Sequence, residues 1–348
     1  MISCVLDFSR EHQQFFGSRI IAGLAFLVKS DSKAIVLGEA WSDLLKILTF
    51  YCRIPNLANA AFECLMSLIA VSSSPLNYQV SFSYLLNLLK DETVHCSSDR
   101  ILDAMVQLYS RLRNIMSRMR KYESPSKDKN LIKELWFIAL DSFSEALKDP
   151  RIDVRIHVVD CLQRALLSSG VIIKNAKLIK LAFEKYLFPI LSIFEDESCL
   201  RSLKDFSPVD IKIKVSNLMF QTFIVNVRWL CLLRDFEDFW LTFLGLLDNF
   251  MNLTEPNEQL SFHFKESLRN CLVTMILDSV FDEVHHRTGT DLLSLTLSII
   301  ESVRPTFKDD LLSTVKEVEV MPRNVLSPDS LQSSRTASPA RSSSSMRL

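Results

Sequence analysis

The stretch that decides the fold is DPRIDVRIHVVDCLQRALL at residues 149–167. Apolar residues recur there at Val154, Val158 and Leu162, a spacing of four that puts them on one face of a helix. Asp149 is suited to cap this helix, and the proline after it fits a first turn, where no backbone N–H is needed. The stretch therefore predicts a turn followed by a helix with one buried side.

Composition extends this prediction to the whole chain. Only six of its 348 residues are Gly, where average usage of about 7% would give roughly 24. Nucleotide-binding and β-rich folds need Gly for phosphate loops, tight turns and caps. Helical periodicity recurs up to about residue 316, and no convincing run of strict alternation is present. The sequence predicts an all-α fold and argues against most nucleotide-binding enzymes.

A similar helix recurs five times along the chain. The five segments are Asn56–Ile69, Asp99–Leu112, Val154–Leu167, Val209–Ile224 and Phe264–Leu277. Each contains one anchor leucine, and the anchors are Leu65, Leu108, Leu162, Leu218 and Leu272. Successive anchors lie about 43 to 56 residues apart, close to the helix-pair repeat of HEAT and armadillo arrays. The expected fold is an α-solenoid of HEAT/armadillo-like helix pairs.

The triplet Asp153-Val154-Arg155 resembles the hallmark of HEAT repeats, in which the Asp and the Arg tie neighbouring units together. The resemblance implies that Asp153 and Arg155 make such a tie here. A chance match inside an ordinary helical bundle stays open as the alternative.

The chain is expected to have four parts: an N-terminal part of the array at 1–122, a polar linker at 123–130, a C-terminal array at 131–316 and a tail at 317–348. The tail is rich in Ser and Arg and poor in large apolar residues, which predicts disorder. Ser327 and Ser338 each precede a proline and are possible phosphorylation sites. A solvated terminus without a switch is the alternative.

No catalytic, cofactor-binding or metal-binding motif is found. Phosphate-loop, dinucleotide, nucleophile-elbow and metalloprotease patterns are absent. No two of the eight cysteines are closer than twelve residues, so zinc-type spacing is missing, and Cys64, Cys161 and Cys271 are expected as reduced core residues of a cytosolic protein. The adjacent His285 and His286 are expected in a polar loop. A formal net charge of −1 does not suggest a nucleic-acid partner.

One basic cluster stands out. It consists of Arg111, Arg113, Arg118, Arg120 and Lys121. An apolar stripe that includes Leu108, Leu112 and Met116 lies between and before them. A basic amphipathic helix of this kind can bind anionic lipid or an acidic partner. The alternative is a core helix whose basic face is simply solvated.

The second half of the chain resembles a known family. Four blocks carry the resemblance, at residues 161–167, 185–191, 239–244 and 265–272. In this order they are similar to the C-terminal helical region of the Golgi-specific brefeldin A-resistance factors, a family of large Arf guanine-nucleotide exchange factors. Residues 304–311 resemble the end of the same region, and coverage is best over about 130–316.

The resemblance implies an α-solenoid and a cytoplasmic protein attached peripherally to Golgi membranes, which acts in vesicle traffic through the small GTPase Arf. The family's catalytic domain is missing here. Leu37-Gly38-Glu39-Ala40 superficially resembles the loop around the catalytic glutamate, but its flanks do not match, and Glu39 is expected to begin a helix.

The chain by itself is therefore expected to be a non-catalytic regulatory or scaffold region without a cofactor, with protein partners on its surface. Two alternatives stay open. One is a truncated product of a gene whose full protein is the enzyme. The other is a free-standing HEAT-repeat adaptor that is unrelated to nucleotide exchange.

Overall fold

The computed structural model describes residues 10–30, 39–71, 74–121, 127–167, 175–195, 207–251, 257–304, 307 and 309–313. Every regular element of ordinary length in this part of the chain is a helix, which confirms the all-α prediction. The α-helices are α2 (Arg10–Ser30), α4 (Glu39–Tyr51), α5 (Pro55–Val71), α6 (Pro75–Lys90), α7 (Ser98–Lys121), α8 (Lys127–Ala146), α9 (Ile152–Leu167), α10 (Ala176–Ala182), α11 (Phe188–Ile193), α13 (Pro208–Leu230), α14 (Phe236–Met251), α15 (Glu258–Leu277), α16 (Val280–Thr288) and α17 (Leu292–Val303). A π-helical turn, η1 (Phe183–Leu187), joins α10 to α11.

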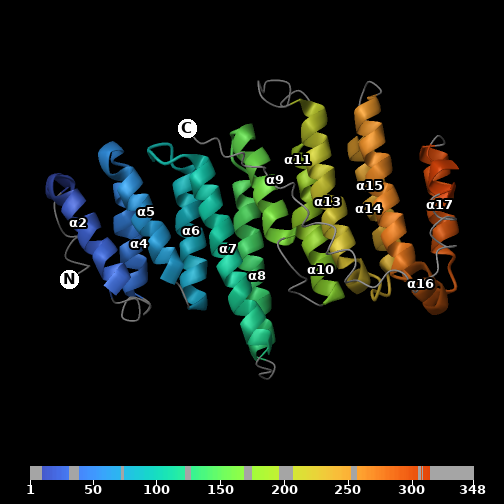
Figure 1. The fold of residues 1–348 in the computed structure, drawn as a ribbon, viewed down its shortest axis with the longest axis horizontal. Helices are drawn as coiled ribbons and strands as arrows, with labels where there is room; N and C mark the ends of the chain where they lie inside the picture. Colours follow the sequence, from blue (N-terminus) through green and yellow to red (C-terminus); the bar gives the residue numbers. More distant parts are fainter. Residues whose placement is uncertain are drawn as a thin grey trace, which may run out of the picture. The chain divides into compact units, whose positions relative to one another are not determined.

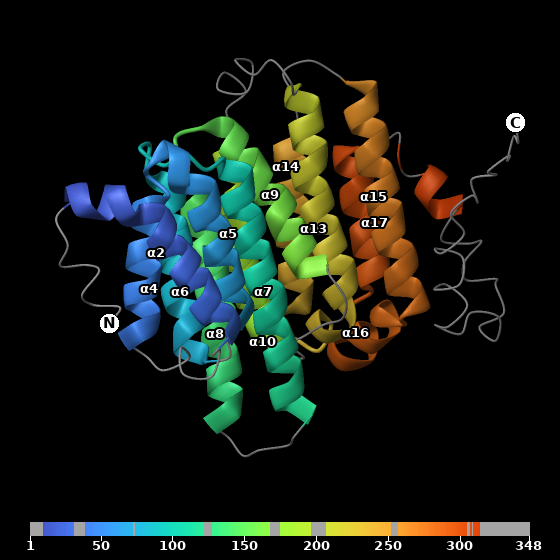
Figure 2. The same cartoon turned by 60° about the vertical axis from the view of Figure 1, so that its left-hand side comes forward.

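The chain divides into two compact units, Met1–Leu268 and Arg269–Leu348. Helices of the first unit form two layers (Figures 1 and 2). One row runs α2, α5, α7, α9, α13, and each of these helices packs on the next. The other row runs α4, α6, α8, and then η1 with α11 and α14. Successive helix pairs thus place one helix in each layer, which is the arrangement of an α-solenoid.

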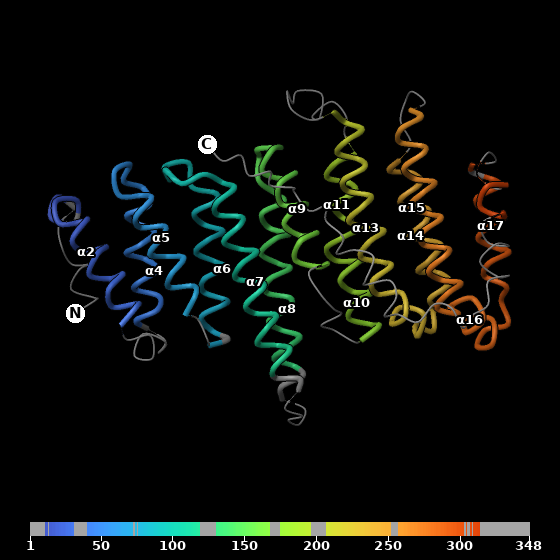
Figure 3. Tube along the Cα trace, in the orientation of Figure 1, coloured from blue at the N-terminus to red at the C-terminus, as the bar shows by residue number. Residues whose placement is uncertain are grey.

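The anchor leucines confirm the repeat. Leu65, Leu108, Leu162 and Leu218 lie on α5, α7, α9 and α13, the consecutive helices of one row (Figure 3), and all four are buried. Leu272, on α15 in the second unit, is buried as well. Because all the anchors are buried, the apolar period of the sequence correctly predicted the inner sides of these helices.

The π-helical turn has a local cause. Pro189 has no backbone N–H to donate to the carbonyl of Lys185, and the backbone N–H of Phe188 bonds the carbonyl of Phe183, five residues back. Phe183 lies on this turn and packs edge-on against Phe239 of α14, with ring centroids 5.5 Å apart. The turn therefore connects the α10–α11 segment to α14 through an aromatic contact.

Two local predictions need correction. Helix α9 begins at Ile152, so Pro150 lies in the turn before it rather than in its first turn. The Asp149 side chain still accepts a hydrogen bond from the backbone N–H of Arg151, at 3.0 Å. The loop predicted for the adjacent histidines is wrong, because they lie in α16, where buried apolar residues give a helical face.

The expected linker at 123–130 overlaps a helix, since α8 begins at Lys127. Helices α7 and α8 pack on one another and lie in the same compact unit, so this region is a helical hairpin. The predicted tail at 317–348, with Ser327 and Ser338, lies outside the described residues.

Candidate functional site

The basic cluster lies on α7, near the free end of the α7–α8 hairpin. In both views this hairpin extends past the ends of neighbouring helices (Figures 1 and 2). Arg118 is exposed, and Arg113 is half-buried beside Tyr109. The side chains of Arg120 and Lys121 lie outside the described part of the structure, although both residues are in the helix.

Arg111 has a packing role. Its Nη1 donates a hydrogen bond to the carbonyl oxygen of Ala70, at 2.6 Å. This bond satisfies a carbonyl in the last turn of α5, where the helix itself provides no partner. Arg111 therefore ties α7 to α5, and less of its charge is available to an external ligand than the sequence suggests.

The apolar stripe of α7 faces the protein interior. Leu108, Leu112 and Met116 are all buried between the two layers. They cannot enter a lipid bilayer without taking the array apart. A contact of this hairpin with a membrane would therefore be electrostatic, and no helix in the described segments is long and apolar enough to pass through a bilayer.

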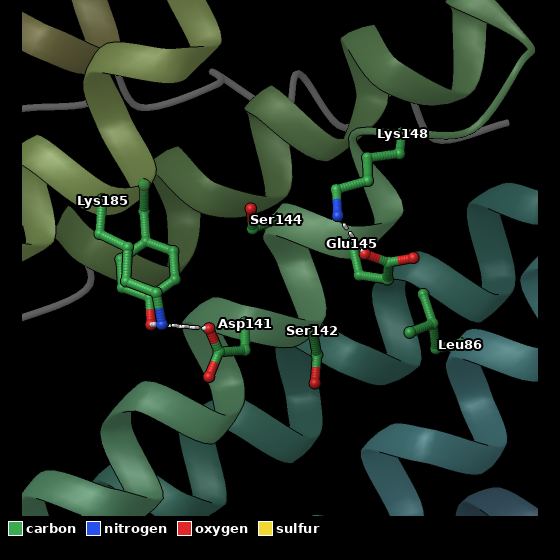
Figure 4. A pocket seen from close by; sticks show the side chains of 8 residues that line it. Leu86, Asp141, Ser142, Ser144, Glu145, Lys148 and Lys185 are labelled. Atoms are coloured by element: carbon green, nitrogen blue, oxygen red, sulfur yellow. Dashed lines mark hydrogen bonds and ion pairs between the residues drawn. The ribbon is translucent and has the colours of Figure 1, made fainter.

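An open polar depression of about 430 Å³ lies on the other layer, between α6, α8 and η1 (Figure 4). Asp141 of α8 accepts hydrogen bonds from the Tyr186 hydroxyl at 2.8 Å and from Lys185 Nζ at 2.9 Å. Lys185 Nζ also donates to the Tyr186 hydroxyl, at 2.9 Å. The other lining residues are Leu86, Ser142, Ser144, Glu145 and Lys148.

Burial and hydrogen bonds shift the pKa values of the ionisable groups in this depression. Burial raises the pKa of Tyr186 to about 12. Hydrogen bonds with Tyr186 and Asp141 raise the pKa of Lys185. Hydrogen bonds from Lys148 and Lys90 lower the pKa of Glu145. The tyrosine therefore stays protonated while the lysine and the glutamate stay charged, and the hydrogen bonds of the cluster join η1 to α8.

Neighbouring helices of the α5–α7–α9–α13 row are tied by ion pairs across the surface. The ion pairs are Arg100–Glu63 at 2.6 Å, Arg164–Asp103 at 2.7 Å and Lys214–Asp160 at 2.7 Å, and His157 Nδ1 lies 2.7 Å from Asp99 Oδ1. Exposed pairs of this kind each contribute about 0.2–1 kcal/mol. Sequence reasoning missed them because the partners are 37 to 61 residues apart.

The tie expected from Asp153 and Arg155 stays a prediction. Asp153 is exposed, and Arg155 is half-buried and near enough to Asp149 to lower the pKa of that carboxyl. The contact to the preceding repeat that starts from this turn is made by Arg151, which donates to the Leu89 carbonyl at 2.7 Å.

Three side chains with metal-ligating atoms meet between α7 and α9. The ligand atoms of Asp103, His157 and Cys161 lie within 4.8 Å of one another. The sequence-based search for close cysteine pairs could not find this group, because it contains one cysteine. The only local sign was the spacing of four between His157 and Cys161, which puts both on one face of a helix.

The fold defines a class: an α-helical repeat protein, in which ion pairs join neighbouring helices. Residues 136–307 match the family described as the GBF1-like tetratricopeptide repeat region. This part of the chain therefore carries the GBF1-like helical region. The solenoid prediction is confirmed, and the family description names tetratricopeptide repeats where the sequence suggested HEAT or armadillo pairs.

Two plant Arf exchange factors are similar to a larger part of the chain. The chain is 19% identical over 349 aligned residues to the ARF guanine-nucleotide exchange factor GNL1 of Arabidopsis thaliana. It is 20% identical over 343 residues to the ARF guanine-nucleotide exchange factor GNOM of the same plant. Each alignment covers 94% of this chain and 24% of the relative, so the chain spans about a quarter of their length.

The part of the relatives that matches lies outside their catalytic exchange domain. No solved structure matches the chain. About half of the residues in the four blocks that carry the family resemblance are buried, including Cys161, Tyr186, Trp240 and Cys271. These buried residues reflect packing, so function has to be argued from the surface.

Proposed function

We propose that this chain is a non-catalytic scaffold region of a large Arf exchange factor, which controls the activation of Arf by the catalytic domain of the parent protein in Golgi vesicle traffic. The proposal rests on one observation. A two-layer helical array is matched over nearly its whole length by the non-catalytic part of two Arf exchange factors.

The surface of the first unit suits a scaffold. Stacked helix pairs offer a long surface along which other domains can dock. On α2, Phe15 is 80% exposed and Phe26 is 70% exposed, while Ile21 and Leu24 pack inward. Residues 15 and 26 are eleven apart, three helical turns, so both phenylalanines are on the same face. Exposed apolar groups of this kind often mark a protein contact.

The basic end of the α7–α8 hairpin supports peripheral attachment to an anionic membrane. Arg118 is exposed there, and the apolar stripe beneath is occupied by packing. Attraction of Lys and Arg to anionic lipid contributes about 1 kcal/mol per residue close to the surface and weakens as salt is added. We infer a weak, salt-sensitive attachment that adds to other membrane contacts of the parent protein.

Nucleotide release from Arf tests the scaffold role. The chain is added to Arf loaded with a fluorescent guanine nucleotide, alone and with the separately purified catalytic domain of a family member. We expect no release by the chain alone and a changed rate when both are present. F15S with F26S should abolish the change, whereas F262S, which alters an exposed residue on another helix, should keep it.

Either of two results would refute this proposal. Release catalysed by the chain alone would make it an exchange factor in its own right. An unchanged rate in the presence of the chain, together with no binding to the catalytic domain, would favour the free-standing adaptor.

Liposome flotation tests membrane attachment. R113E with R118E is expected to reduce flotation with anionic vesicles and to leave the background with neutral vesicles unchanged. K29E with K177E is a matched control, because it reverses two exposed charges on other helices. Arg111 is left intact, since its loss would loosen α7 from α5. Equal flotation of the two double variants would rule out attachment through the hairpin.

A further inference from the structure

Helices α7 and α9 present two pairs of ligand-type side chains to each other. Asp99 and Asp103 are one turn apart on α7, and His157 and Cys161 are one turn apart on α9. The two helices pack side by side in one row of the array. The ligand atoms of Asp103, His157 and Cys161 come within 4.8 Å of one another. This group has no part in the function proposed above.

The surroundings of the histidine resemble those of a metal ligand. His157 Nδ1 lies 2.7 Å from Asp99 Oδ1. A ligating histidine almost always donates its other ring N–H to a carboxylate, a backbone carbonyl or water, which fixes the ring and increases the basicity of the ligating nitrogen. Asp99 could hold Nδ1 of His157 in this way, and Nε2 would then be the nitrogen that binds an ion.

The three residues differ in their exposure to solvent: one is buried and two are partly exposed. Cys161 is completely buried, whereas the His157 side chain is 28% exposed and the Asp103 side chain is 48% exposed. An ion could reach the sulfur from solvent through the more open side of this group. The sulfur would lie away from water, where oxidation and exchange are slower.

A cation already occupies the point where the acidic ligands converge. Arg164 Nη2 lies 2.7 Å from Asp103 Oδ1 and 3.2 Å from Cys161 Sγ. The Arg164 side chain is 49% exposed, so it can turn outward into water without uncovering the core. The guanidinium is thus an internal competitor for an incoming metal ion.

We propose that Asp103, His157 and Cys161 form a zinc site that clamps α7 to α9. One thiolate, one imidazole and one carboxylate suit Zn²⁺, and the soft sulfur disfavours Mg²⁺ and Ca²⁺. Tetrahedral Zn²⁺ holds such atoms about 3.6 Å apart. The ligands therefore need to move inward by about 1 Å, and water takes the fourth position. Binding releases the Cys161 proton to solvent and displaces Arg164.

A bound metal ion would make it harder for α9 to separate from α7. Zinc would link two consecutive helices of one row, across the surface where ion pairs now join them. Opening of α9 from α7 would then require loss of the metal. Exchange of the backbone amides in these two helices should become slower when zinc is bound.

Metal titration of the full chain tests the site. The chain is stripped with chelator and titrated with Co²⁺, whose thiolate complex has a near-ultraviolet charge-transfer band, and then with Zn²⁺ by calorimetry. We expect one equivalent to bind, with the cobalt band present. H157Q and C161S should each weaken binding at least tenfold. R164Q should strengthen binding, because it removes the competing cation.

D160N is the matched control, since it changes a carboxylate on the same helix that pairs with Lys214 instead. It should bind like the wild type. C161S could disturb the core, so two other variants test the site independently of folding. H157Q changes a partly exposed residue, and R164Q is expected to change the metal affinity in the opposite direction. Absence of the cobalt band, or equal affinity in H157Q and D160N, would overturn the proposal.

Discussion

Replacing Asp149 by asparagine should loosen the joint between the α8–α9 turn and the preceding helix pair. The Asp149 side chain is 1% exposed and accepts hydrogen bonds from Arg151 Nε and Nη2, both at 2.9 Å. Arg151 then donates to the Leu89 carbonyl at 2.7 Å and to Ser98 Oγ at 3.0 Å, at the end of α6 and the start of α7. One buried carboxylate thus orients the guanidinium that ties two repeats.

The expected loss follows from these contacts. A hydrogen bond to a charged group contributes about 1.5–3 kcal/mol. Breaking a fully buried ion pair costs about 3–5 kcal/mol. The Arg151 side chain is 45% exposed and can be rehydrated, and asparagine keeps one oxygen as an acceptor. We therefore expect the free energy of unfolding at pH 7 to fall by about 1.5–2.5 kcal/mol in D149N.

The effect should depend on pH. Burial by itself raises the pKa of the Asp149 carboxyl, but the hydrogen bonds from Arg151 outweigh it, and the pKa stays below its usual value. A group whose pKa is lower in the folded chain adds stability above the ordinary Asp pKa of about 3.9. This stability is lost as pH falls through the folded pKa. The advantage of the wild type over D149N should be complete at pH 7 and shrink below about pH 4.

Urea denaturation at several pH values, with amide exchange to locate the change, measures this effect. D238N is the matched control, because Asp238 is an exposed carboxylate in the first turn of another helix, α14. It should change stability by less than about 0.5 kcal/mol. Equal stability of D149N and wild type at pH 7, or a difference that persists unchanged in acid, would refute the reasoning. A large loss in a separate variant, D153N, would support the HEAT-type tie.

Two further comparisons follow from the packing. On α2, G17A should be less stable than G23A by about 1 kcal/mol in urea denaturation. An added Cβ at Gly17 meets the movable end of the Leu57 side chain at 2.3 Å and the ring of buried Tyr51 at 3.0 Å, whereas Gly23 has no atom within 4 Å. In alkylation followed by mass spectrometry, Cys96 should react faster than Cys64, since a hydrogen bond with Cys52 lowers the pKa of Cys96 while burial raises the pKa of Cys64 to about 11.

Each of these two predictions has an outcome that would contradict it. If the two glycine variants unfold at the same urea concentration, α2 does not pack closely against α5 in solution. If Cys64 is alkylated as fast as Cys96 in the folded chain, the packing around α5 is open rather than closed.

The helices themselves could be predicted from the sequence because helix formation depends on residues close together in the chain. The spacing of Val154, Val158 and Leu162 is repeated every turn, and it correctly predicted α9 and its buried side. For the same reason, the anchor leucines located α5, α7, α9 and α13 of one row but missed α2. Helix ends were less predictable, as at Ile152, because the last residue before a helix is set by competing caps in the turn.

The roles of surface residues could be predicted only in part from the sequence. The sequence grouped five basic residues as one cluster, but the structure shows that Arg111 is used to satisfy a carbonyl on α5. It also shows that the apolar stripe beside them is buried. The sequence shows that charged residues are present. Whether they can bind a ligand depends on which groups of the neighbouring helix they contact.

By itself, the sequence determined an all-α chain, a repeat of about fifty residues, and a likeness to the helical region of large Arf exchange factors. Each of these follows from short-range periodicity or from buried residue blocks, which any stretch of chain displays without its partners. Only the tertiary structure decided that Arg151 reaches the preceding repeat, and that Asp103 meets His157 and Cys161. Such meetings depend on the register and crossing of helices more than forty residues apart, and no local pattern encodes that register.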